Sequence, residues 1–251
     1  MLRLWDARTG SYAVLASPSV PLRACVHGHS GRTWSDLADL RVLLVADVLT
    51  RVAELQGMET ITVLAADSPP PAGLGEDLSA LGIRPPAALA SHAEARAMLG
   101  GPVQVHVTRL PPGSGDGGDG VLIGVGAVHD LTQRAASGKR GDLLALRLAL
   151  LSCRYREPVT LTPAALNDAA VLAGRWRRRV AEWAAEPSRP VPADAASVIR
   201  GALDEDLDTV VALDLLRGME SRPDVPAGAK FETFLFVDRV LGLELPREIG
   251  R

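Results

Sequence analysis

The sequence has few cysteines, no long apolar run and no excess of charge, and each scarcity excludes a class of protein. The two cysteines, Cys25 and Cys153, are too few for a disulfide framework and have no CxxC spacing, so a reducing compartment is expected. No apolar stretch approaches the roughly 18 residues of a membrane span, and the N-terminus lacks the basic and apolar segments of a secretion signal. We therefore expect a cytoplasmic protein that does not associate with membranes.

The net charge of −3 argues against a general nucleic-acid binder, because affinity for phosphate backbones depends on clustered Lys and Arg. The run "GRWRRRVAEW" is a local exception, since Arg175, Arg178 and Arg179 would share one helical face and could meet a phosphate backbone. The alternative is a solvated helix face opposite Trp176 and Trp183, which would pack in a helical core together with Val180. We favour the solvated face.

The first 130 residues alternate between strand-like and helix-like patterns. Residues 2–15 predict a small hairpin that turns at Gly10. Residues 22–67 predict a βαβ unit: an apolar strand ending in glycine, a buried helix from Ser35 to Gly57, and a β-branched strand. Further strands are expected in "PVQVHVTRL" and "VLIGVGAV", with the flexible acidic loop "PPGSGDGGDG" between them. The pattern is typical of an α/β, Rossmann-like core with a parallel sheet.

A proline-rich connection and two short helices interrupt this core at about 68–101, where Ser91 is the expected N-cap of the second helix. From Asp142 onward the pattern is almost wholly helical. The predicted helices span 142–155, 163–186, 194–203, 208–219 and 228–242. We therefore predict a Rossmann-like domain over 1–141 and a C-terminal all-helical bundle over 142–251.

Several stretches resemble a known family, the class I cysteinyl-tRNA synthetases and their tRNA-independent relatives, the mycothiol-pathway cysteine ligases. The matching stretches, in the family's order and spacing, are "LRLWDARTG", "CVHG" at 25–28, "ADVLTRVAELQGMETITV" at 46–63, "ALRLALLSCRYREPV" at 145–159 and "ALDEDLDTVVAL" at 202–213. The resemblance implies a class I synthetase catalytic core followed by helices. It also implies a lineage of ATP-dependent ligases that activate cysteine.

Two differences in length qualify this resemblance. The family's middle insertion, which carries metal ligands and part of the substrate pocket, is shortened to about 68–101. The anticodon-reading domain of the synthetases does not follow "DRVLGLEL". Recognition of tRNA is therefore not expected, and the resemblance shifts toward the mycothiol ligases, which use a small amino-sugar acceptor.

The family's H-I-G-H tetrad, which holds the ATP phosphates, aligns without a gap on "DLAD", Asp36 to Asp39. Both histidines are then aspartates and the glycine is Ala38. A carboxylate about 4 Å from a phosphate repels it by roughly 1 kcal/mol in water and about 4 kcal/mol at an effective dielectric of 20. The alternative, which we favour for this stretch taken alone, is a serine N-cap followed by aspartates that suit the helix dipole.

The family's mobile K-M-S-K-S loop supplies lysines that neutralise phosphate, and its position here holds "GSGDGGDG", with two acids and no lysine. A displaced lysine loop at "SGKRGD" is a weaker alternative, because Lys139 follows the last strand and is expected on the surface. The resemblance also implies a zinc site, in which the strand-end cysteine is replaced by His27. His27 remains a weak metal candidate with His29, and we expect no metal ligand set and no cofactor: the family's ATP, magnesium and zinc contacts look lost.

We therefore predict a shortened, motif-degenerate and catalytically inactive paralogue whose old cleft binds an unidentified small molecule or protein partner. The alternative is a shortened, tRNA-independent ligase or transferase that uses ATP to join a cysteine-like amino acid to a small amine. No catalytic residue is assigned. The cleft candidates, expected at the carboxyl ends of parallel strands, are His27, Gly28, His29, Ser30, Trp34, Asp36, Asp39 and Asp67.

Overall fold

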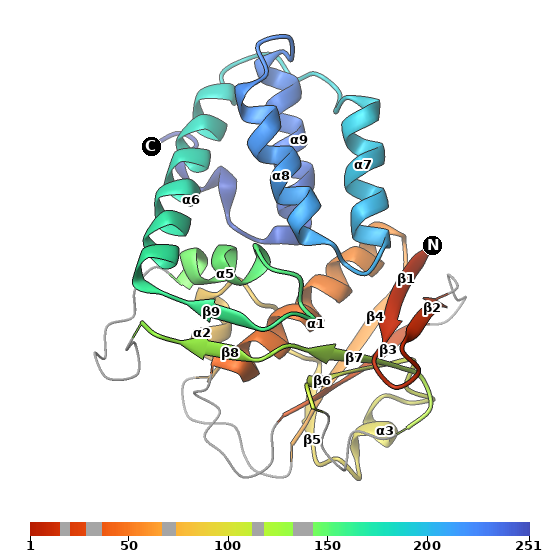
Figure 1. Ribbon diagram of the computed structural model, residues 1–251. Helices are drawn as coiled ribbons and strands as arrows, with labels where there is room; N and C mark the ends of the chain where they lie inside the picture. The colour runs from red at the N-terminus through yellow and green to blue at the C-terminus, as the bar shows by residue number, and fades with distance from the viewer. Residues whose placement is uncertain (16–20, 29–36, 67–73, 112–117, 133–142) are drawn as a thin grey trace. The chain divides into compact units, whose positions relative to one another are not determined.

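A computed structural model describes the chain except for residues 16–20, 29–36, 67–73, 112–117 and 133–142 (Figure 1). It divides into two compact units. The first comprises 1–130 together with 155–160, and the second comprises 131–154 together with 161–251. The domain boundary expected between residues 141 and 142 lies within the undescribed stretch 133–142, and it stays a prediction.

The first unit contains a five-stranded, all-parallel sheet, so the predicted Rossmann-like α/β core is confirmed. The strand order is β5-β4-β3-β6-β7. These strands are β3 (Leu22–His27), β4 (Thr60–Ala65), β5 (Ala88–Ala90), β6 (Val105–Arg109) and β7 (Val121–Val125). Strands β3 and β6 are neighbours although α1 and four further elements separate them in the chain, so their carboxyl ends meet at one edge of the sheet.

The predicted βαβ unit is present, and its helix covers one face of the sheet. Helix α1 (Leu37–Leu55) connects the parallel strands β3 and β4 and contacts both, as well as β6. Gly57 has φ +78°, the left-handed conformation that ends a helix without steric cost to glycine. The buried Arg41 of α1 donates hydrogen bonds to the carbonyl oxygens of Gly126 (2.9 Å) and Glu157 (2.7 Å), which joins segment 155–160 to this unit.

The segments that connect β4 to β5 and β5 to β6 carry short helices. Helix α2 (Leu74–Ala80) precedes β5, and α3 spans only Ala95–Met98, with Glu94 rather than Ser91 as its N-cap. The hydroxyl and backbone N–H of Ser91 instead donate to the Glu94 carboxylate, at 2.6 and 3.2 Å, and these bonds lower the pKa of Glu94. The predicted longer helix is therefore wrong, because Ser91 and Glu94 close a turn before the helix begins.

The predicted hairpin is present as β1 (Leu2–Asp6) and β2 (Ser11–Leu15). Asp6 accepts a hydrogen bond from the backbone N–H of Leu122, at 3.2 Å, so the hairpin is attached to β7. The sequence patterns missed three short strands: β5, β8 (Val128–Asp130) and β9 (Val159–Leu161). Each has three residues, which is too short for a period-two pattern to stand out.

The second unit is helical, as predicted. Its elements are α5 (Leu143–Leu151), α6 (Pro163–Trp183), α7 (Ala193–Asp204), α8 (Thr209–Ser221), α9 (Ala227–Leu241) and the 3-10 helix η1 (Leu245–Glu248). Trp176 and Trp183 make edge-to-face contacts with Phe234, at ring-centroid distances of 5.6 and 5.0 Å. Val180 is also fully buried, which confirms that this side of α6 faces the helical core.

Candidate functional site

The sequence candidates divide into those that the structure describes and those that lie outside the described residues. His27 is the last residue of β3 and is buried, and the N–H of Gly28 donates to the carbonyl oxygen of Ala65 at 2.8 Å. Asp39 lies in the first turn of α1. The remaining candidates, His29, Ser30, Trp34, Asp36 and Asp67, lie outside the described residues.

Asp39 makes an ion pair that sequence reasoning missed. Its carboxylate is 2.6 Å from the guanidinium of Arg109, the last residue of β6. The Asp39 side chain is 3% exposed and that of Arg109 is 19% exposed, so the pair is largely shielded from water. The start of α1, where the family resemblance places a phosphate-binding group, thus holds an acid that is already neutralised by a cation from the neighbouring strand.

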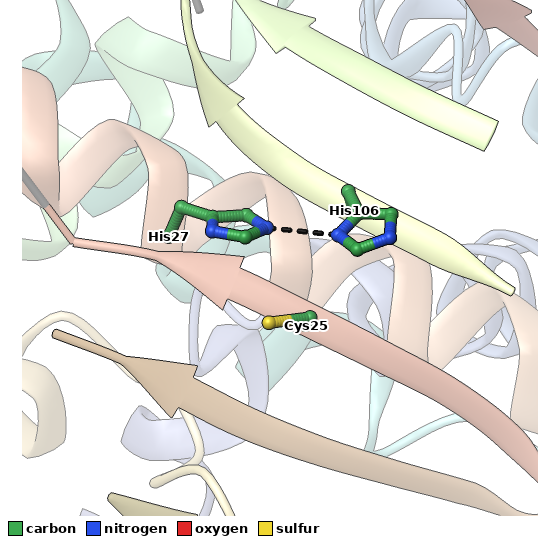
Figure 2. A group of neighbouring side chains, drawn as sticks. All are labelled: Cys25, His27 and His106. Atoms are coloured by element: carbon green, nitrogen blue, oxygen red, sulfur yellow. Dashed lines mark hydrogen bonds between the residues drawn. The ribbon is translucent and has the colours of Figure 1, made fainter. Parts of the chain in front are cut away.

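A second group of polar side chains lies on the face of the sheet away from α1. Cys25 and His27 point to the same face because they are two positions apart on β3, and Cys25 is the register partner of His106 on β6. One potential ligand atom from each of the three lies within 4.8 Å of the others, and all three side chains are buried. Figure 2 shows the two imidazole rings turned toward one another, with Cys25 on the same strand as His27.

Hydrogen bonds define the orientation of His106. Its Nε2 lies 3.1 Å from the carbonyl oxygen of Asp119, and a carbonyl can only accept, so this nitrogen carries the proton. In the neutral ring Nδ1 then has the lone pair and accepts from Nε2 of His27, at 2.9 Å. The ring of His92 stacks on that of His27, with ring centroids 5.4 Å apart.

This cluster opens onto a cavity of about 270 Å³ in the first unit. The polar residues in its lining are Cys25, His27, His92, Arg96, His106 and Asp119. Behind Cys25 the wall is apolar, because this side chain packs in a core with Val63 and Ala65 of β4 and with Ala95 and Leu99 around α3. The cavity therefore joins a hydrophobic wall to a group of imidazole, thiol and charged side chains.

Sequence reasoning identified His27 but missed Cys25, His106 and Arg109. The spacing of Cys25 and His27 in "CVH" was a usable signal, since alternate residues of a strand share a face. No local signal connects His106 or Arg109 to the first strand, because their proximity depends on β6 pairing with β3. Part of the acidic loop also belongs to the site, because the carbonyl of Asp119 holds His106.

Comparison with known proteins supports a relationship to cysteine ligases. No family model matches the chain. The chain is similar to enzymes described as L-cysteine:1D-myo-inositol 2-amino-2-deoxy-alpha-D-glucopyranoside ligases. Those of Thermobifida fusca and Rhodococcus erythropolis are each 37% identical over 114 residues, and that of Nocardiopsis dassonvillei is 43% identical over 72 residues.

These matches cover part of each chain. The aligned region is 42% of this chain and 26% of the Thermobifida protein, 43% and 26% for Rhodococcus, and 29% and 17% for Nocardiopsis. The chain thus spans about a quarter or less of the length of the curated relatives it matches. Among the described residues, no helix is both long and apolar enough to cross a bilayer.

Proposed function

We propose that this chain is a cysteine-ligase-like protein that does not form an adenylate, and that its cleft at the carboxyl ends of β3 and β6 binds a small molecule or a protein partner. The similarity to cysteine ligases supports the lineage. The main observation in support of a protein that does not use ATP is the ion pair between Asp39 and Arg109. In this proposal the protein uses neither ATP nor magnesium.

Electrostatic repulsion opposes the binding of ATP at this position. A phosphate at the start of α1 would approach the Asp39 carboxylate, and like charges about 4 Å apart repel by roughly 4 kcal/mol at an effective dielectric of 20. The helix N-terminus attracts anions, but an effect of about 0.3–1 kcal/mol does not offset that repulsion. Arg109 offsets part of this repulsion, but because its guanidinium is held 2.6 Å from the Asp39 carboxylate, the pair presents no net positive charge to a phosphate.

An active ligase is the second candidate, and Arg109 is the observation that favours it. If Asp39 turned away from Arg109, the guanidinium would become available to a phosphate group at the carboxyl end of β6. Asp39 would then be free to hold magnesium or the amine of a substrate. Under this alternative the chain would use ATP to join a cysteine-like amino acid to a small amine, without tRNA.

Calorimetry with Mg-ATP and cysteine-dependent pyrophosphate exchange separate the two candidates. We expect the protein to show no exchange and no ATP binding at sub-millimolar concentration. The triple variant Asp36→His/Ala38→Gly/Asp39→His should bind ATP weakly, with a gain of about 1–3 kcal/mol from removing the like charges. It should still not catalyse exchange, because the loop ending at Gly120 lacks lysine.

A matched control is Glu76→His/Asp77→His, which makes the same change of charge in the first turn of α2. It should leave ATP binding unchanged. Pyrophosphate exchange by the unmodified protein at an ordinary ligase rate would overturn the proposal. A folded triple variant that binds ATP no better than the control would show that "DLAD" is not the former phosphate site and that helix capping is its role.

A further inference from the structure

We propose that Cys25, His27 and His106 form a three-ligand site for a soft divalent cation, with Zn²⁺ as the physiological ion. The expectation from the sequence was a lost zinc site, because the partners of His27 would have come from the shortened insertion. The structure supplies two other partners, one from two positions earlier on β3 and one from β6. The proposed ligand set therefore comes entirely from neighbouring strands of the sheet.

The donor chemistry fits this ion. Thiolate and imidazole are the ligands that zinc prefers, and three protein ligands leave one coordination position open. Here that position would face the cavity of about 270 Å³, where a water molecule or a small ligand can complete the tetrahedron. A structural site of four protein ligands would need no such cavity.

The distances are close to those of a loaded site. With Zn–N bonds of about 2.0–2.1 Å, two tetrahedral nitrogen ligands lie about 3.4 Å apart, and a sulfur and a nitrogen about 3.6 Å apart. Nε2 of His27 and Nδ1 of His106 are 2.9 Å apart, and the whole ligand set spans no more than 4.8 Å. Side-chain adjustments of about 1 Å or less would therefore admit the ion.

The orientation of His106 is the second observation. Metal-ligating histidines usually donate their other ring N–H to a carboxylate or a backbone carbonyl, which fixes the ring and its tautomer. Nε2 of His106 makes this bond to Asp119, so Nδ1 points its lone pair toward His27. Without metal, the proton on Nε2 of His27 occupies the space of the ion, and binding would release it.

Rigid surroundings add to the preorganisation of the site. Cys25 and His106 are direct register partners in the parallel β3–β6 pair, so the sheet sets the separation of their backbones. The side chains of Cys25, His27 and His106 are 3%, 6% and 6% exposed. Sites built on strands hold their ligands more precisely than sites on loops, which lowers the cost of ordering them on binding.

The test is metal binding by the full chain after chelation and dialysis. We expect about one Zn²⁺ per chain by elemental analysis, and a Co²⁺ form with a thiolate-to-cobalt charge-transfer band and tetrahedral d–d bands. Cys25→Ser, His27→Gln and His106→Gln should each weaken Zn²⁺ binding by at least about 10–100-fold, since loss of an outer-shell partner alone costs that much. The charge-transfer band should disappear in Cys25→Ser.

The controls are Cys153→Ser, the second thiol of the chain, and His129→Gln, an exposed histidine on β8. Both should bind Zn²⁺ as tightly as the parent. The proposal is overturned if the Co²⁺ form of the parent protein shows no charge-transfer band. This outcome is measured on the parent alone, so it does not depend on whether the variants fold. Equal loss in Cys153→Ser would overturn it too. None of these measurements uses ATP. A negative result would therefore contradict the metal site without contradicting the proposed loss of adenylate formation.

Discussion

Asp39 has a structural role that is separate from any effect on nucleotide binding. A buried carboxylate is tolerated because a cation faces it, and breaking such a pair from one side leaves the other charge in a poorly solvated position. Arg109 extends from the carboxyl end of β6, so the pair also connects the start of α1 to the sheet. An acid at the first turn of this helix is therefore required by its neighbour as well as favoured by the helix dipole.

We expect Asp39→Asn to lower the free energy of unfolding by about 3 kcal/mol. This is the low end of the cost of breaking a buried pair, because Arg109 is 19% exposed. The double variant Asp39→Asn/Arg109→Met should recover most of the loss, since it removes both charges. Urea denaturation of the two single variants and the double variant measures the coupling. A neutral effect of Asp39→Asn would show that the pair is as weak as a surface ion pair.

At the scale of the element, the start of a helix depends on nearby residues in the chain, whereas the position of a short strand depends on its pairing with a distant strand. Helix α6 begins where Thr162 accepts a hydrogen bond from the N–H of Ala165, at 3.1 Å, and Pro163 occupies the first turn. Both signals are local and readable from the chain. Strand β5, by contrast, has three residues and is a strand only because it pairs with β4.

Replacing the cap should therefore act on α6 alone. Thr162→Ala should destabilise the second unit by about 1 kcal/mol, because one backbone N–H at the helix start loses its acceptor. Thr162→Ser keeps the hydroxyl and should be nearly neutral. Thermal denaturation followed by circular dichroism measures both. An equal loss in the serine variant would assign the effect to the threonine methyl group instead of the cap.

At the scale of the whole molecule, acids balance part of the positive charge on α6. Two arginines of the basic run are paired with acids: Arg175 lies 3.0 Å from Glu220, and Arg179 lies 2.9 Å from Glu182. These exposed pairs contribute little to stability, but they reduce the positive potential that a phosphate backbone would meet. With a net charge of −3, the chain has no excess of cations to release counterions from RNA.

We accordingly expect weak binding to tRNA. At physiological salt the dissociation constant should be no tighter than the roughly 1–100 µM of non-specific complexes, and electrophoretic mobility shift measures it. Glu220→Gln frees Arg175 and Arg179 from their shared acid and should strengthen any residual binding slightly. Sub-micromolar affinity for tRNA would contradict the interpretation of the basic run as a solvated helix face.

The sequence by itself determined the kinds of elements and their order. Helical spacing in α1 and α6, the β-branched run of β4 and the glycine that ends α1 are local patterns, and they predicted the parallel core and the helical second unit. These predictions succeed because hydrophobic periodicity over ten or more residues records which face of an element is buried. The same property explains the misses, since β5, β8, β9 and α3 are too short to record a period.

Only the tertiary structure decided which side chains meet at the site. His27 and His106 are 79 positions apart, and Cys25 faces His106 because β6 inserts beside β3 in one register out of several that local patterns allow. The pairing of Asp39 with Arg109 depends on the same neighbouring strand. A register is set by long-range packing and shared hydrogen bonds, and a shift of one residue would turn every side chain of β6 to the other face.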